Sequence, residues 1–242
     1  NIIIKNTDAS GYDLEAGVQV RGIYLIDMPH IGKYTFYDIG INVTFINSKY
    51  GEIKFLQPIR GSGTNLSNDV RIGNNSVNVE SGTKPGLDKS ANVTLYNMPG
   101  NFVNPAILRD GKFCGDICYN FTNLNAPEVK FNVSYWTNYS VGEGLTFCGV
   151  LNVSNREYTQ ITRITPITSP CINITAQNVT FNGNGFDIVN YTFTGTIIYS
   201  NAMNTTIKNT NISIGSGNGI EFVGVNNGTI FNNTIKGVHW GV

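Results

Sequence analysis

Charge is scarce in this 242-residue sequence, and its two signs cancel. Lys and Arg together number 16, Asp and Glu also number 16, and charged residues make up only 13% of the chain. A nucleic-acid-binding protein needs a basic face to meet the phosphates, and docking on anionic lipid needs a basic cluster. The composition therefore argues against both kinds of partner.

Long apolar runs and helix-forming residues are also lacking. No stretch approaches the roughly 18 apolar residues that a membrane-spanning helix needs, so we expect no membrane span. Ala, Leu, Glu and Lys are sparse, whereas Asn, Gly, Thr, Ile and Val dominate, which favours strands and turns. No signal peptide is evident at Asn1, so we interpret the sequence as mature or trimmed.

Residues that carry chemistry are few. Two histidines, His30 and His239, leave no plausible serine–histidine–acid set, and no phosphate-binding or dinucleotide fingerprint occurs. The C-terminal segment offers Glu157, Asp187 and Glu221 as its acids. Polysaccharide hydrolases need paired carboxylates, and lyases need an acidic calcium site with a base. We therefore expect no enzyme activity, no metal and no cofactor.

What the sequence has in excess is the N-glycosylation motif Asn-x-[Ser/Thr]. With 34 Asn, 14 Ser and 23 Thr, chance placement gives about 5 matches, whereas the sequence contains 15. A repeat that happens to contain Asn-x-Thr explains part of this excess near the C-terminus, but not before residue 140. We expect glycans, and hence export, with candidate sites at Asn42, Asn65, Asn74, Asn92, Asn120, Asn132, Asn138, Asn152, Asn173, Asn178, Asn190, Asn204, Asn211, Asn227 and Asn232.

Strand phase places two of these asparagines on an outer face. In residues 129–135 the apolar set is Val129, Phe131 and Val133, which leaves Asn132 pointing outward. In residues 91–96 the same alternation sets Asn92 opposite its apolar neighbours. Both asparagines are therefore predicted where a glycan has room.

The four cysteines suggest two disulfides, because an even count is typical of exported chains. Cys114 and Cys118 can close a small loop, and Cys148 and Cys171 are 23 residues apart. Zinc is the competing interpretation, but zinc usually takes Cys or His at short paired spacings, and neither histidine is close in sequence to either pair.

A short motif, Asn-x-Thr-[Phe/Ile]-x-Asn, recurs toward the C-terminus. It occurs at 204–209 and 227–232, with a weaker copy at 178–183, so that the spacings are 26 and 23 residues. Such periods, with short apolar strands and Asn/Gly turns, indicate a solenoid of stacked β-coils. The inward residues are predicted to be Ile172, Ile174, Ile197, Ile207, Ile220, Phe222, Ile230 and Ile235. A Cys148–Cys171 disulfide would then join neighbouring coils.

The same motif fits residues 1–6 and 42–47, and chance recurrence in an Asn-rich chain is the alternative. Between the two repeat regions, turns rich in Gly, Asn and Pro separate short strands, which is typical of a sandwich. These strands are expected at 51–58, 69–73, 76–80, 91–97, 105–108 and 129–136. The chain is therefore predicted to be all-β, with an Ig-like β-sandwich at 51–145 flanked by solenoid coils at 1–50 and a parallel β-helix from 146 to 242.

Three segments carry a resemblance to known proteins: Cys148-Gly-Val-Leu, Ser169-Pro-Cys-Ile-Asn-Ile-Thr and Asn178-Val-Thr-Phe-Asn-Gly-Asn-Gly. They resemble the opening of the right-handed parallel β-helices of archaeal cell-surface proteins, a solenoid type also seen in the NosD-like copper-maturation family. Residues 51–55 through 85–92 resemble the β-rich module that accompanies such helices. The resemblance implies an exterior location and structural, adhesive or polysaccharide-contacting duties.

We therefore expect a structural subunit of an extracellular surface layer or filament. Because the sequence starts and stops inside solenoid-like segments, it is expected to be a piece of a longer protein or to assemble head to tail, with further copies or neighbouring surface proteins as partners. A carbohydrate-binding adhesin is the alternative, with Trp136, Tyr139, Tyr158 and Trp240 as candidate stacking residues. A β-helix polysaccharide lyase or hydrolase ranks last.

Overall fold

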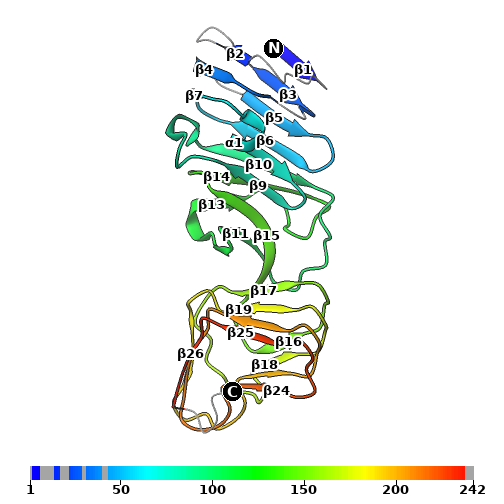
Figure 1. Ribbon diagram of the computed structural model, residues 1–242, viewed down its shortest axis with the longest axis vertical. Coiled ribbons are helices and arrows are strands. Elements are labelled where there is room, and N and C mark those ends of the chain that lie inside the picture. The colour runs from blue at the N-terminus through cyan, green and yellow to red at the C-terminus, as the bar shows by residue number, and fades with distance from the viewer. Residues whose placement is uncertain (1, 6–13, 17–21, 29–30, 40–42, 238–242) are drawn as a thin grey trace. The chain divides into compact units, whose positions relative to one another are not determined.

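The computed structural model describes residues 2–5, 14–16, 22–28, 31–39 and 43–237. The chain divides into two compact units, Asn1–Val141 and Gly142–Val242. The regular structure is almost entirely β-strand (Figure 1), which confirms the predicted all-β class. The helical elements are single turns: α1 (Leu66–Asp69), η1 (Pro85–Leu87) and η2 (Gly115–Ile117). No helix among these described residues is long and apolar enough to cross a membrane.

Stacked parallel strands form the first part of the N-terminal unit. Strands β1 (Ile2–Lys5), β3 (Ile23–Ile26) and β5 (Val43–Asn47) pair in parallel, and so do β2 (Leu14–Ala16) and β4 (Tyr34–Ile39). Ile3, Tyr24 and Thr44 occupy equivalent positions, at spacings that match one solenoid coil. The parallel β-solenoid predicted from the N-terminal motifs is therefore present.

Antiparallel strands continue these same sheets. Strands β6 (Gly51–Phe55), β10 (Ala91–Tyr96), β14 (Glu128–Val133) and β13 (Cys118–Asn120) extend the β1–β3–β5 sheet, and β7 (Ile59–Gly63) pairs antiparallel with β4. The reversal occurs in the β5–β6 hairpin, where the Asn47 side chain accepts hydrogen bonds from the backbone N–H groups of Lys49 and Tyr50, both at 3.1 Å. One sheet thus runs through the expected boundary at residues 50 and 51. The three-part division and the separate β-sandwich stay predictions.

The remaining strands of this unit are β8 (Val70–Gly73), β9 (Ser76–Val79), β11 (Pro105–Arg109) and β12 (Lys112–Phe113). Strand β15 (Asn138–Leu145) pairs through its first residues with β9. All six of the expected strands begin within one residue of the observed ones. A core of Phe55, Trp136, Phe131 and Tyr139 rings holds the sheets together, with neighbouring ring centroids 5.7–6.4 Å apart.

The C-terminal unit is a parallel β-helix with three faces, visible as stacked strands in Figure 1. The first face contains β16 (Gly149–Leu151), β18 (Ile172–Ile174), β21 (Ile198–Ser200) and β24 (Ile220–Phe222). The second contains the end of β15 followed by β17 (Glu157–Gln160), β19 (Thr180–Asn182), β22 (Thr206–Lys208) and β25 (Thr229–Phe231). The third contains β20 (Asp187–Asn190), β23 (Asn211–Ile214) and β26 (Thr234–Lys236).

The predicted period and inward residues match this helix. Thr180, Thr206 and Thr229 are register partners, which reproduces the spacings of 26 and 23 residues. Ile172, Ile174, Ile197, Ile207 and Ile220 are at most 1% exposed. Phe222, Ile230 and Ile235 pack against this core but are only partly buried, because the described residues include no further coil over β24, β25 and β26.

Both predicted disulfides are present. Cys148 and Cys171 precede the paired strands β16 and β18, with Cα atoms 4.5 Å apart, so this bond joins neighbouring coils as expected. Cys114 and Cys118 are linked across η2, with Cα atoms 5.8 Å apart. The Cys114–Cys118 bond thus connects the end of β12 to the start of β13. These two strands belong to different sheets, so the bond lies where the chain passes from one sheet to the other.

Candidate functional site

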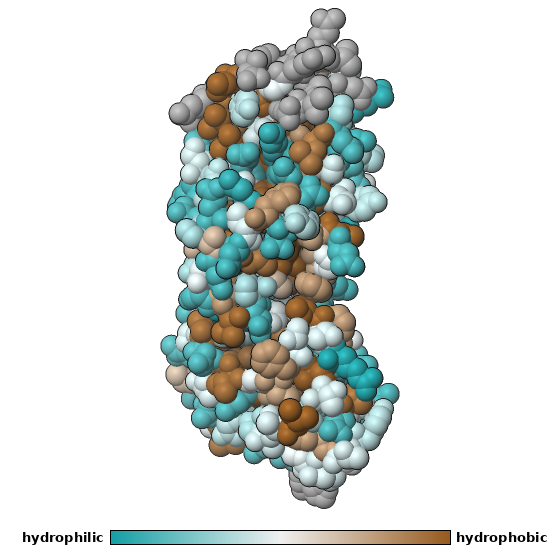
Figure 2. All heavy atoms as spheres, turned by 180° about the vertical axis from the view of Figure 1, so that it is seen from behind, coloured by the Kyte–Doolittle hydropathy of each residue, from teal (hydrophilic) through white to brown (hydrophobic). Residues whose placement is uncertain are grey.

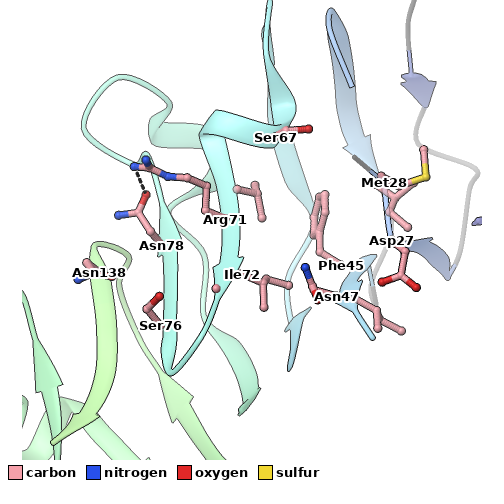
Figure 3. Close-up of a pocket in the computed structure, with 14 residues that line it drawn as sticks. Asp27, Met28, Phe45, Asn47, Ser67, Arg71, Ile72, Ser76, Asn78 and Asn138 are labelled. Atoms are coloured by element: carbon pink, nitrogen blue, oxygen red, sulfur yellow. Dashed lines mark hydrogen bonds between the residues drawn. The ribbon is translucent and has the colours of Figure 1, made fainter. Parts of the chain in front are cut away.

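A groove of about 940 Å³ lies in the N-terminal unit. Phe45 from β5 lies on one side of the groove and Ile72 from β8 lies across from it (Figure 3). Leu25 from β3 and Val70 from β8 add to its apolar lining. Strand β8 pairs with β9 and with no other described strand, so the second edge of β8 has no strand partner among the described residues. The groove therefore combines an apolar lining with a strand edge.

Two polar groups at the rim of this groove are already engaged. Asp27 accepts hydrogen bonds from the Ser48 backbone N–H and from Ser48 Oγ, both at 2.6 Å. Arg71 Nη2 donates to Asn78 Oδ1 at 3.2 Å, as the dashed line in Figure 3 shows. Asp27 is the one carboxylate among the residues that line the groove. A two-carboxylate hydrolytic site therefore has no basis in this lining.

The three acids expected in the solenoid are kept apart by its three faces. Glu157 lies on β17, Asp187 on β20 and Glu221 on β24, which belong to different sheets. Glu157 Oε1 is 3.1 Å from Lys208 Nζ. Hydrogen bonds from Asn218 and Thr196 to Glu221 hold the pKa of that carboxyl below its usual value. No two of these acids share a face on which they could act together.

A fourth acid of this unit, Glu143, was not among the sequence candidates. It is the register partner of Tyr158 in an inward row that continues with Phe181 and Ile207. Its carboxylate is 1% exposed and lies 3.1 Å from Arg156 Nη1, whose side chain is 11% exposed. A buried charge needs a partner, so this ion pair serves the packing of the coil.

Metal ligands are equally sparse. Among the residues that the structure describes, no cluster of three or more His, Cys, Asp or Glu side chains is arranged to hold a metal ion. All four cysteines form disulfides, so none supplies a thiolate to zinc. His30 and His239 lie outside the described residues.

The aromatic residues expected to stack on sugars are buried, which corrects that prediction. Trp136, Tyr139 and Tyr158 are 1%, 0% and 3% exposed. Trp136 Nε1 donates to the Lys89 carbonyl at 2.7 Å, and burial raises the pKa of the Tyr139 and Tyr158 hydroxyls. These rings fill the cores instead, while Trp240 lies outside the described residues.

A different aromatic pair is exposed. Tyr119 and Phe121 are 67% and 53% exposed, and their ring centroids are 5.3 Å apart in an edge-to-face arrangement. They lie on and just after β13, which is the edge strand of the seven-stranded sheet. Other exposed apolar side chains are interspersed with polar ones over the face shown in Figure 2. The pair and the strand edge together form a candidate interaction surface that sequence reasoning missed.

The candidate glycosylation sites differ in their surroundings. Asn42 lies outside the described residues. The exposed sites that belong to no side-chain ladder are Asn65, Asn74, Asn120, Asn138 and Asn152. Asn173, Asn190 and Asn211 are half-buried, and the Nδ2 atoms of the last two donate to the carbonyls of Pro166 and Gly185. Occupancy of all these sites stays a prediction.

Asn92 and Asn132 are half-buried cross-strand partners on β10 and β14. Their apolar neighbours Val93, Phe131 and Val133 are fully buried, so the predicted outward phase is confirmed. Asn132 Nδ2 donates to Asn92 Oδ1 and to the Ala91 carbonyl, both at 3.1 Å.

Four asparagines form a ladder along one corner of the solenoid: Asn155, Asn178, Asn204 and Asn227. Each Nδ2 donates to the Oδ1 of the preceding member, at 2.8, 2.7 and 3.2 Å in chain order. All four have φ between 55° and 59°, a left-handed conformation that asparagine tolerates better than most residues. An amide both donates and accepts, so identical residues on successive coils satisfy one another.

A second ladder runs beside the second face. Asn182 Nδ2 donates to Glu157 Oε1 at 2.8 Å, Asn209 to Asn182 at 3.0 Å, and Asn232 to Asn209 at 2.7 Å. Four motif asparagines, at 178, 204, 227 and 232, thus belong to ladders. The regular Asn spacing was the available sequence signal, and it was interpreted as glycosylation and turns alone.

Comparison with protein-family models, with curated proteins and with solved structures finds no match for this chain.

Proposed function

We propose that this chain is a structural subunit of an extracellular surface layer or filament, N-glycosylated and assembled through β-rich contacts between copies. The observation that carries the proposal is the stack of parallel coils, which a disulfide and two side-chain ladders bind to one another. Such a stack is a rigid spacer in which Glu157, Asp187 and Glu221 lie on different faces, while the buried Glu143 is paired with Arg156. We propose no catalytic role.

An exterior location is supported by covalent chemistry. Disulfides persist in oxidising compartments and are rare in the cytosol, and both cysteine pairs here are bonded. The threefold excess of glycosylation motifs over chance supports the same location. The resemblance to archaeal β-helix surface proteins, and the sandwich that accompanies such helices, belong to this proposal as well.

Assembly between copies is supported by the β13 edge. An edge strand offers unpaired backbone donors and acceptors to another chain. Here the edge carries Tyr119 and Phe121, and both residues are more than half exposed. A net charge of zero removes the repulsion that would keep copies apart.

Sedimentation velocity over a concentration series tests this surface. The wild-type chain is expected to form concentration-dependent oligomers, and the double variant Tyr119→Ser/Phe121→Ser is expected to lose them while it keeps its far-UV spectrum. Tyr191→Ser is the control, because Tyr191 is 73% exposed but belongs to the other compact unit. Equal association by all three proteins would rule out the β13 edge as the contact.

Carbohydrate binding is the second candidate, favoured by the same exposed pair, since aromatic rings stack on sugars. A glycan array separates the two functions. Adhesin activity requires binding of a polysaccharide that the Tyr119→Ser/Phe121→Ser variant loses, whereas a purely structural subunit binds none.

A further inference from the structure

Some motif asparagines lie so close together that their glycans compete for space. Asn178, Asn204 and Asn227 stand on successive coils and are joined by Nδ2–Oδ1 hydrogen bonds of 2.7 and 3.2 Å. Asn92 and Asn132 face each other across two strands, joined at 3.1 Å. Nδ2 is the atom to which an N-glycan is bonded, so the geometry of these amides decides which sites are compatible.

The coil spacing sets the steric limit along the ladder. Neighbouring β-strands are about 4.8 Å apart, and the ladder amides repeat at that interval. A pyranose ring with its acetamido group is broader than this spacing, so glycans on adjacent coils overlap. The backbone cannot move the two sites apart, because the N–H of Asn204 donates to the Asn226 carbonyl at 2.9 Å and that of Asn178 to the Met203 carbonyl at 3.0 Å.

In the cross-strand pair Asn92 and Asn132, the hydrogen bonds also indicate which of the two asparagines is modified. Asn132 Nδ2 has two hydrogens, and these are directed to Asn92 Oδ1 and to the Ala91 carbonyl. A glycan on Asn132 replaces one hydrogen and breaks one of these bonds. Asn92 Nδ2 donates to no described group, so a glycan there costs no hydrogen bond.

We propose that neighbouring sites exclude each other in the folded protein: glycans do not occupy Asn178 with Asn204, nor Asn204 with Asn227, and Asn92 is modified while Asn132 is not. This proposal rests on the proposed function only in that the chain meets a glycosylating machinery. Asn178 and Asn227 are two coils apart and are compatible. The ladder therefore carries at most two glycans on three motifs.

Expression of the whole chain in a secretory host that modifies Asn-x-[Ser/Thr] tests the ladder independently of the natural source. Trypsin releases residues 164–208 as one peptide, because no Lys or Arg lies between Arg163 and Lys208. In a Thr175→Ala/Thr192→Ala background, Asn178 and Asn204 are the remaining motifs on that peptide. Mass spectrometry of the secreted, folded protein is expected to show no glycan or one, with doubly modified chains retained in the cell.

Thr206→Ala provides the matched control, since it removes the motif of Asn204 but leaves its amide in the ladder. Modification of Asn178 is expected to rise in this variant. A secreted, folded protein with two glycans on peptide 164–208 would overturn the exclusion, and so would unchanged occupancy of Asn178.

The cross-strand pair is tested by single variants in the same host. Asn92→Gln is expected to lower the mass of the secreted protein by one glycan, while Ser134→Ala, which removes the motif of Asn132, leaves the mass unchanged. Ser134 is exposed, so its substitution leaves the fold intact. A mass loss in Ser134→Ala with no loss in Asn92→Gln would contradict the proposal. An absence of glycans from naturally produced protein would instead count against the proposed function alone.

Discussion

At the corners of the C-terminal coils, asparagine performs two tasks at once. Its backbone adopts the left-handed conformation that turns the chain, and its side-chain amide bonds to the coils before and after. Glycine performs the first task without the second, and alanine performs neither well. Substitutions at one ladder position therefore separate the two contributions.

We expect Asn204→Ala to lower the free energy of unfolding by about 2–3 kcal/mol, since it adds left-handed strain of about 1–2 kcal/mol and removes hydrogen bonds worth about 1 kcal/mol. Asn204→Gly should cost only about 1 kcal/mol because it keeps the turn. Urea unfolding of unglycosylated protein measures both. Asn201→Ala, at an exposed position outside the ladder, is the control, and an equal loss there would contradict the ladder's role.

Tyr34 links stability to alkaline pH. Its ring is 1% exposed and its hydroxyl donates to Asp69 Oδ2 at 2.8 Å. Burial, with the nearby Asp69 carboxylate, raises the pKa of Tyr34 far above its ordinary 10.0. Above pH 10 the unfolded chain releases this proton while the folded chain keeps it, so the free energy of unfolding falls as pH rises.

Chemical denaturation from roughly pH 8 to pH 11 checks this dependence, because this range includes the ordinary tyrosine pKa of about 10. Tyr34→Phe is expected to reduce the alkaline loss, whereas Tyr37→Phe on the same strand leaves it unchanged because Tyr37 is exposed. Identical profiles for both variants and the wild type would show that Tyr34 has no part in the alkaline loss.

Among the elements, those with clear alternation or repeats were predictable. Strands β6, β8, β9, β10, β11 and β14 all begin within one residue of expectation. Buried and exposed residues alternate in β6, β9 and β14, which makes these strands recognisable in the sequence. Strand β15 was missed, since its Gly142, Glu143 and Gly144 look like a turn. Glu143 is buried only because Arg156 is brought to it by the next coil, and sequence periodicity contains no such information.

The groove and the exposed pair were unpredictable for a related reason. Whether Trp136 or Tyr119 is buried depends on which sheet its strand joins, and β13 is placed at an edge by pairing with β14 alone. Local pattern identifies a strand but not its position in a sheet. The ladders, by contrast, were present in the sequence as regularly spaced asparagines.

The two disulfides are expected to differ in effect. Cys148–Cys171 closes a loop with a sequence separation of 23 and Cys114–Cys118 one of 4. Loop-closure entropy gives about 3 kcal/mol for the first and about 2 kcal/mol for the second. Thermal unfolding of Cys148→Ser/Cys171→Ser should show the larger drop in Tm, with Cys114→Ser/Cys118→Ser as the comparison. A larger drop in Tm for Cys114→Ser/Cys118→Ser would contradict the expectation that the Cys148–Cys171 bond between coils stabilises the protein more.

For the molecule as a whole, the proposed role is that of a scaffold. Its coils are joined by backbone pairing, ladders and a disulfide, and its net charge is zero. In the proposed assembly, attraction between copies depends on strand edges and aromatic rings rather than on ion pairs. Assembly should therefore be nearly insensitive to salt, since screening acts on charges.

Electron microscopy of the purified, disulfide-bonded protein under native conditions tests the structural role most directly. The proposed structural role predicts ordered filaments or layers that persist in high salt. Discrete monomers at every concentration examined would contradict it.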